Sequence, residues 1–192
     1  HGIIGEEYGE INPEAEFTWV LDPIDGTRSF AAGSPHFGTL VCLRQDAEPI
    51  WGSIHIPALG KLIIGNNTFC LCNDQPVTLP HPPTLDKCFL LTTDPKSPAI
   101  SHDASGWDAL VEANDHYRSW GDCFGYTLLL SGGAHIMTDP IMNLWDIAAL
   151  LPILSGAGAA ATDWYGDPPV DENGLVACHP DIHADVIRIL NP

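Results

Sequence analysis

The feature that most constrains this chain is a short segment in which two aspartates are separated by a proline and followed by a glycine. An apolar run with β-strand character at 17–21 leads directly into the residues Asp-Pro-Ile-Asp-Gly-Thr at 22–27. Pro23 fixes one backbone angle between the two carboxylates, and Gly26 permits a sharp turn. We expect Thr27 to begin a short helix as its N-cap.

The chemistry of this segment favours a site for a phosphate ester and a divalent cation. Asp22 and Asp25 are three residues apart across a turn, so both side chains can reach the same side. Carboxylate oxygens are ligands suited to Mg²⁺, Ca²⁺ or Mn²⁺, and the N–H groups that begin a helix suit a phosphate. The alternative is that these residues only form a turn, because the same residue types dominate turns for local reasons.

Composition limits the possible partners. The chain has 192 residues, of which 45% are hydrophobic, enough for a core in one domain or two small ones. Seven Lys and Arg stand against 25 Asp and Glu, giving a formal net charge of −18, which argues against nucleic acid or an anionic membrane as partner. A phosphate site in so acidic a chain needs metal ions to reverse the local charge.

The cysteines and the chain ends bear on location. The six cysteines lack the density and length context of a secreted disulfide framework, so we interpret them as free thiols in a reducing cytoplasm. We find no membrane-spanning run and no charged leader. Because the chain begins with His1 directly inside a strand-like run, we expect that an N-terminal segment is absent from it.

Hydrophobic periodicity divides the chain into two halves. Residues 1–79 predict a β-meander half that carries the Asp-Pro-Ile-Asp-Gly-Thr segment, with strands at 17–21, 38–43, 50–56, 61–64 and 69–72 and a polar loop at 10–16. The proline-rich segment 75–84 is the candidate linker. Residues 80–192 predict an α/β half, with strands at 89–92, 135–138, 159–162 and 175–178 and helices at 105–113, 126–130, 145–154 and 182–190.

Two further acids occupy positions suited to a metal cluster. Glu6 follows the first strand, and Asp146 lies at the head of an apolar helix, where an acid suits the helix dipole. Closely spaced divalent cations need several carboxylates from separate segments. Spacing alone indicates only the Asp22–Asp25 pair, and it does not predict that Glu6 and Asp146 join it.

Three segments of the chain, in their order, resemble the signature segments of the inositol monophosphatase family. They are Gly5-Glu6-Glu7, the run from Trp19 to Thr27, and Trp145-Asp146-Ile147-Ala148-Ala149. The resemblance covers essentially the whole chain, and it is greatest to the histidinol-phosphatase branch, through residues 27–33, 38–40, 121–126 and 148–153.

The resemblance implies the family's layered α+β or α/β sandwich, the sugar phosphatase fold, truncated at its N-terminus. Members of the family carry roughly two long helices before the Gly-Glu-Glu segment, and one of them covers a face of a sheet. We therefore expect an uncovered apolar face, and weak activity or none for these 192 residues alone. The full-length protein is expected to be active, and the family likeness suggests a homodimer.

The resemblance also implies a phosphoric monoester hydrolase that uses two or three Mg²⁺ ions. Glu6 and Asp22, with the Ile24 carbonyl, resemble ligands of the first ion. Asp22, Asp25 and Asp146 resemble ligands of the second, and a third, weaker ion would also use Glu6. Water activated by magnesium would attack phosphorus directly, without a covalent phosphoenzyme.

Further roles follow from the same resemblance. Thr27 and Glu6 resemble the pair that orients the attacking water, so the expected catalytic residues are Glu6, Thr27 and Asp25. The backbone N–H groups of Gly26 and Thr27 are expected to hold the phosphate. Glu7 resembles an acid behind the ligands rather than a ligand itself.

Two acids bear on the choice of substrate. Asp139 lies seven residues before Asp146, where family members often have a glutamate that contacts the leaving group, and Asp122 lies where histidinol phosphatases also have an acid. Two carboxylates beside the leaving group would favour histidinol, which carries an ammonium group, over a neutral polyol. This predicts a histidinol-phosphate phosphatase of histidine biosynthesis.

Three alternatives remain open. Asp122 could serve only as a cap of the following helix. The substrate could be inositol 1-phosphate or another sugar phosphate. The chain could also be catalytically impaired and bind only metal or phosphate.

Overall fold

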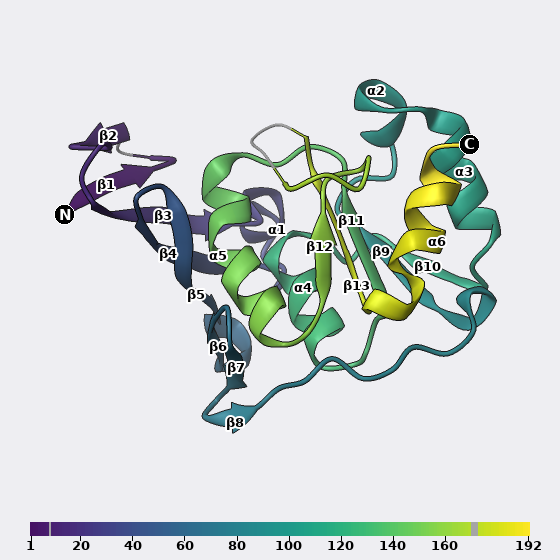
Figure 1. The fold of residues 1–192 in the computed structure, drawn as a ribbon, viewed down its shortest axis with the longest axis horizontal. Helices are drawn as coiled ribbons and strands as arrows, with labels where there is room; N and C mark the ends of the chain where they lie inside the picture. Colours follow the sequence, from purple (N-terminus) through teal and green to yellow (C-terminus); the bar gives the residue numbers. More distant parts are fainter. Residues whose placement is uncertain (8, 170–172) are drawn as a thin grey trace.

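A computed structural model describes residues 1–7, 9–169 and 173–192 of the chain. The elements form successive layers: an eight-stranded sheet, a pair of helices, a five-stranded sheet and a second pair of helices (Figure 1). This arrangement confirms the predicted layered α/β sandwich.

The first sheet is built from residues 2–76 and is almost entirely antiparallel. Its spatial order is β2-β1-β3-β4-β5-β6-β7-β8, and only β1 and β3 pair in parallel. Its strands are β1 (Gly2–Gly5), β2 (Gly9–Ile11), β3 (Phe17–Asp25), β4 (Gly38–Gln45), β5 (Glu48–Ile56), β6 (Lys61–Asn66), β7 (Phe69–Cys72) and β8 (Gln75–Pro76). The predicted meander is thus present, with each strand hydrogen-bonded to the next along the chain from β3 onward.

One strand of this sheet lies where a polar loop was expected. Residues 10–16 were predicted as a loop, but β2 pairs antiparallel with β1, placing Ile11 opposite Ile3. Gly9, the first residue of β2, has a φ of 71°, which glycine adopts without strain. The free edge of β1 accounts for the difference, because its unpaired backbone groups gain partners from even a polar segment.

The second sheet is mixed and has the order β10-β9-β11-β13-β12. Strands β9 (Phe89–Thr92), β10 (His116–Arg118) and β11 (Ile136–Asp139) run parallel, whereas β13 (Leu175–Cys178) and β12 (Ala160–Thr162) are antiparallel to their neighbours. Strand β10 was not predicted. It has only three residues, none of them fully buried, so it carries no apolar pattern.

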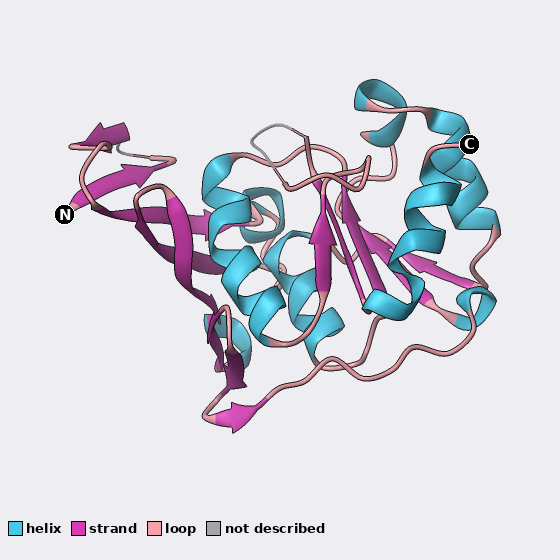
Figure 2. Ribbon diagram, viewed as in Figure 1, coloured by secondary structure: helices cyan, strands magenta, loops and turns pink. Residues whose placement is uncertain are grey.

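The helices lie between the sheets and outside the second sheet (Figure 2). Helices α4 (Asp122–Leu130) and α5 (Leu144–Gly156) fill the space between the sheets, whereas α3 (Ala104–Glu112) and α6 (Pro180–Leu190) pack together on the outer side. The short elements are α1 (Thr27–Ala31), α2 (Pro98–Ser101), η1 (Pro57–Leu59) and η2 (Leu85–Lys87). Within the described part of the chain, no helix combines the length and apolarity required to cross a bilayer.

Helix α5 is the centre of the main core. It is apolar almost throughout, and it continues through Pro152, as the sequence predicted. Its contact with the first sheet depends on Gly52 of β5, because a Cβ atom there would lie 2.1 Å from the carbonyl oxygen of Ala149. The missing side chain therefore lets the helix backbone approach the strand closely.

The opposite face of the first sheet carries no helix among the residues that the structure describes (Figure 1). Apolar side chains line it, including Trp19 and Leu43, which pair across β3 and β4. Ile3 and Leu62 lie on the same face and are 39% and 44% exposed. This agrees with the expected uncovered apolar face.

Replacement of Gly52 by alanine tests the close contact between β5 and α5. We expect Gly52→Ala to lower the free energy of unfolding by about 1–3 kcal/mol, the usual cost of overpacking a core. Gly133→Ala is the matched control, because the nearest heavy atom to its added Cβ would be 3.6 Å away. Chemical denaturation of both variants is the measurement, and a Gly52→Ala variant as stable as the control would contradict this account.

Candidate metal and phosphate site

The end of β3 positions the two aspartates of the Asp-Pro-Ile-Asp-Gly-Thr segment. The pairing of β3 with β4 shifts register between Asp22 and Asp25, so the strand is irregular where the two carboxylates lie. The Asp22 Oδ1 atom accepts a hydrogen bond from the Ile24 N–H at 2.9 Å. The Asp25 Oδ2 atom accepts one from the Cys123 N–H, in the first turn of α4.

The beginning of α5 positions a third carboxylate. Asn143 is the N-cap of α5 and forms a capping box with Asp146. The Asp146 Oδ2 atom accepts hydrogen bonds from the Asn143 backbone N–H at 2.8 Å and from its side-chain amide at 3.2 Å. Helix α5 lies against the first sheet, so this fixed carboxylate faces the end of β3.

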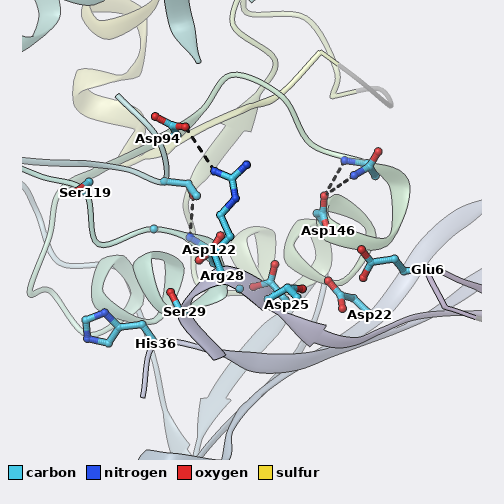
Figure 3. A pocket seen from close by; sticks show the side chains of 15 residues that line it. Glu6, Asp22, Asp25, Arg28, Ser29, His36, Asp94, Ser119, Asp122 and Asp146 are labelled. Carbon is cyan, nitrogen blue, oxygen red and sulfur yellow. Dashed lines mark hydrogen bonds and ion pairs between the residues drawn. The ribbon is translucent and has the colours of Figure 1, made fainter. Parts of the chain in front are cut away.

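The three aspartates converge, and Glu6 lies beside them. One oxygen each from Asp22, Asp25 and Asp146 lies within 4.8 Å of the other two. Figure 3 shows these side chains and that of Glu6 directed toward a common space. Glu7 is exposed and does not line this space.

Burial and neighbouring negative charges raise the pKa values of the carboxylates. Burial raises the pKa of Asp22 to about 8, with further increases from the charges of Asp25, Glu6 and Asp146. Burial also raises the pKa of Asp25 to about 7, although its hydrogen bonds from Cys123 oppose the shift. The pKa of Asp146 is raised mainly by burial as well. Buried carboxylates that repel one another fit divalent cations, which would neutralise all of them at once.

An open cavity of about 520 Å³ adjoins the carboxylates. It is predominantly acidic, and Arg28 is the one Lys or Arg among the described residues that line it. Arg28 extends to Asp94 across the cavity, with an N···O distance of 3.7 Å (Figure 3). The lining residues are Glu6, Asp22, Asp25, Gly26, Thr27, Arg28, Ser29, His36, Thr93, Asp94, Ser119, Gly121, Asp122, Asn143 and Asp146.

The turn into α1 differs in one respect from the prediction. Gly26, and not Thr27, is the N-cap of α1, and its φ of 81° is one that glycine adopts without strain. Thr27 is the first helical residue, and its hydroxyl donates a hydrogen bond to the Ile24 carbonyl at 3.0 Å. The prediction failed because the left-handed conformation at residue 26 moves the helix boundary back by one residue.

The helix-cap alternative for Asp122 is contradicted. The N-cap of α4 is Gly121, which has no side chain to cap the helix, and Asp122 is the first helical residue. Asp122 has a φ of 51°, an unusual value for a residue other than glycine, and its carboxylate lines the cavity. Burial is the main cause that raises its pKa, and the nearby Arg28 opposes the shift.

Asp139 lies beside the open cavity rather than in its wall, and it lines a smaller cavity of about 80 Å³ that it shares with Asp25, Asp122 and Asp146. Its side chain is buried, and its two oxygens accept hydrogen bonds from the Thr93 N–H at 2.9 Å and the Tyr126 hydroxyl at 3.1 Å. The Thr93 hydroxyl in turn accepts the Asp122 N–H at 2.8 Å. Asp139 thus holds Thr93, which in turn holds the backbone of Asp122. The contact of Asp139 with a leaving group stays a prediction.

Several lining residues were not predicted from the sequence. Thr93 and Asp94 directly follow β9, one of the parallel strands, and ligands often bind at the carboxyl ends of such strands. The position of these two polar residues directly after a predicted strand was visible in the sequence. Asn143 lies three residues before Asp146, a spacing typical of a capping box. His36 stacks on Phe124, with ring centroids 4.0 Å apart, a contact that no local pattern indicates.

Comparisons with known proteins place this geometry in a family. The family model described as the inositol monophosphatase family matches residues 1–191. The chain is 38% identical over 170 residues to the bifunctional phosphatase IMPL2, chloroplastic, of Arabidopsis thaliana. It is 34% identical over 185 residues to a histidinol-phosphatase of Chlorobaculum parvum.

The extent of these similarities differs between the relatives. The match covers 86% of this chain but 49% of the Arabidopsis protein, so the chain spans about half of that relative's length. It covers 93% of this chain and 70% of the Chlorobaculum protein. Among solved structures, an inositol monophosphatase from Zymomonas mobilis superposes with a TM-score of 0.87 and is 29% identical, covering 99% of this chain and 75% of that one.

The order of the acidic segments, the layered fold and the family match along nearly the whole chain agree with one another. The chain belongs to the inositol monophosphatase family.

Proposed function

We propose that the protein hydrolyses phosphate monoesters with the help of Mg²⁺ at the open cavity. The observation that carries the proposal is the convergence of the Asp22, Asp25 and Asp146 carboxylates within 4.8 Å, at the wall of a cavity large enough for a small ester. Membership of a family of phosphatases supports it. The six cysteines are all free, which supports a reducing cytoplasm as the location.

The residues would divide the work as follows. Asp22, Asp25 and Asp146, with Glu6 at their side, would hold the cations. Bound Mg²⁺ supplies positive charge that offsets the phosphate and lowers the pKa of a nearby water molecule. The Glu6 carboxylate is exposed to the cavity and can accept a proton from that water.

The start of α1 would orient the water and the phosphate. The Thr27 hydroxyl donates to the Ile24 carbonyl, so its lone pairs remain available to a water molecule. The first N–H groups of a helix have no partners within it, and those of Gly26 and Thr27 would donate to phosphate oxygens. The Ile24 carbonyl is the remaining proposed cation ligand.

We propose histidinol phosphate as the substrate. Beyond the three converging aspartates, the cavity presents Asp122, whose charge favours a positively charged leaving group, whereas Asp94 pairs with Arg28. Similarity to a histidinol-phosphatase at 34% identity supports this choice. The alternative substrate is an inositol or other sugar monophosphate, which the similarity to the Zymomonas mobilis enzyme favours.

Replacement of one converging aspartate tests the reaction. We expect Asp25→Asn in the full-length protein to lower phosphate release by at least about 100-fold, because a neutral amide weakens cation binding where the charge is needed. Asp108→Asn, at an exposed position of α3, is the control and should retain full activity. Release of inorganic phosphate is the measurement. Wild-type turnover by Asp25→Asn would place the chemistry elsewhere, whereas metal and phosphate binding without turnover in the wild type would indicate a binding protein.

Comparison of two esters tests the substrate. We expect kcat/KM to be higher for histidinol phosphate than for inositol 1-phosphate. Asp122→Asn should reduce this preference by about tenfold or more, the value of a hydrogen bond to a charged group. Asparagine tolerates the positive φ at residue 122, so the backbone should keep its conformation. Equal or faster turnover of the inositol ester by the wild type would remove histidinol phosphate as the preferred substrate.

The raised pKa values predict how stability depends on pH. Without metal, folded Asp22 and Asp25 hold protons up to pKa values of about 8 and 7, whereas the unfolded chain releases them near 3.8. The unfolded state therefore binds fewer protons in this window, and stability falls as the pH rises through it. We expect the melting temperature in a chelator to fall from about pH 5 to about pH 8, and Mg²⁺ to reduce the fall.

A variant isolates the contribution of the cluster. Burial lowers the pKa values of His135 and His183, and these shifts act on stability in the opposite direction. We therefore compare the wild type with Asp22→Asn. The melting temperature of Asp22→Asn should fall less between about pH 5 and about pH 8. An identical pH dependence of the two melting temperatures would show that the Asp22 carboxylate does not repel its neighbours as described.

A further inference from the structure

A second group of potential metal ligands lies where the segment after β8 meets the beginning of α6. His81 belongs to that segment, His179 is the N-cap of α6, and Asp181 is in its first turn. One ligand atom of each residue lies within 4.8 Å of the other two, and none of the three lines the open cavity. We propose that these side chains form a separate binding site for a divalent transition metal ion, with Zn²⁺ as the representative ion.

The three side chains bring potential ligand atoms close to one another. The Asp181 Oδ2 atom lies 3.0 Å from the His81 Nδ1 atom and 3.3 Å from the His179 Nδ1 atom. The His179 Nδ1 atom accepts the Asp181 backbone N–H at 3.1 Å, so this nitrogen carries no proton. The unprotonated His179 Nδ1 atom and the Asp181 Oδ2 atom therefore lie close together without a hydrogen bond between them, and a shared cation would offset their repulsion.

The ligand atoms of this site favour a different ion from the one that the carboxylate cluster favours. Two imidazole nitrogens and one carboxylate oxygen are ligands of the kind that bind Zn²⁺ with one position left for water. Imidazole suits Zn²⁺, Cu²⁺ and Ni²⁺, whereas Mg²⁺ prefers oxygen. The alternative to a metal site is that His81 and Asp181 form only an ion pair. Such a pair would contribute little to stability, because the His81 side chain is 84% exposed.

Two effects oppose binding at this position. The lone pair that accepts the N-cap hydrogen bond is the one that a metal ion takes at Nδ1, and a cation at a helix N-terminus opposes the helix dipole. The Asp181 carboxylate offsets the dipole. The His179 side chain is only 13% exposed, so this ligand is already held in place before the ion binds.

A bound ion would join two segments that are far apart in the chain. His81 and Asp181 are separated by 100 positions. The segment between β8 and η2 passes from the first sheet to the second, and Leu79 is its buried anchor. An ion that binds this site only in the folded protein stabilises the fold by mass action. The site is therefore a structural clip between this segment and α6.

Zn²⁺ titration with the carboxylate cluster intact in every sample tests the proposal. Isothermal calorimetry in a large excess of Mg²⁺ compares the wild type with His81→Ala and His179→Asn, and asparagine keeps an acceptor at the N-cap. His55→Ala, at an exposed position of β5, is the matched control. Co²⁺ is a second probe, because it absorbs visible light strongly in a four-coordinate site of the kind that Zn²⁺ prefers and weakly in a six-coordinate oxygen site.

We expect the wild type and His55→Ala to bind one more Zn²⁺ ion than His81→Ala and His179→Asn. The affinity at this site should fall by at least about 100-fold, since loss of even an outer partner of a ligand costs 10–100-fold. Zn²⁺ should raise the melting temperature of the wild type more than that of His81→Ala. Equal stoichiometry and affinity in the wild type and His81→Ala would overturn the proposal. His81 is exposed, so this variant decides the question even if His179→Asn fails to fold.

Discussion

The convergence of three carboxylates, one buried and two partly buried, is the constraint on which this structure depends. Asp22, Asp25 and Asp146 each have one oxygen fixed by a backbone N–H group, from Ile24, Cys123 and Asn143 respectively. Each carboxylate is thereby held in place with a second oxygen outside that bond. Such groups are costly to bury together, and their raised pKa values express that cost. Divalent cations convert this arrangement from a source of instability into a preorganised site.

The fold brings these three donors together through the packing of α5. The helix carries Asp146 at its beginning and lies against the first sheet, which carries Asp22 at the end of β3. The absence of a side chain at Gly52 permits this approach, so the spacing of the carboxylates depends on a contact near the middle of the helix. Asp139 has a comparable role at the other end of the cavity, because it holds Thr93, which holds the backbone of Asp122.

Much of the fold follows from local patterns in the sequence, and much of the site does not. Alternation and apolar runs predicted the long strands and α5, because burial of one face or of a whole element leaves a periodic trace. The short strands β2 and β10 have no such periodic pattern. Their stability comes from hydrogen bonds to a neighbouring strand, and not from burial of their own side chains. Spacing indicated the Asp22–Asp25 pair, but only resemblance linked it to Asp146, because a tertiary contact has no local period. The hydrogen-bond partners of Asp139, Thr93 and Tyr126, could not be predicted, because they become its neighbours only in the folded chain.

The most direct test of the central claim is anomalous diffraction from crystals grown with Mn²⁺, which accepts the same oxygen ligands as Mg²⁺. Our account predicts at least one strong anomalous peak between the carboxylates of Asp22, Asp25 and Asp146, and its loss in crystals of Asp25→Asn. A well-ordered cavity without any peak among these three side chains, at a saturating concentration of Mn²⁺, would contradict it.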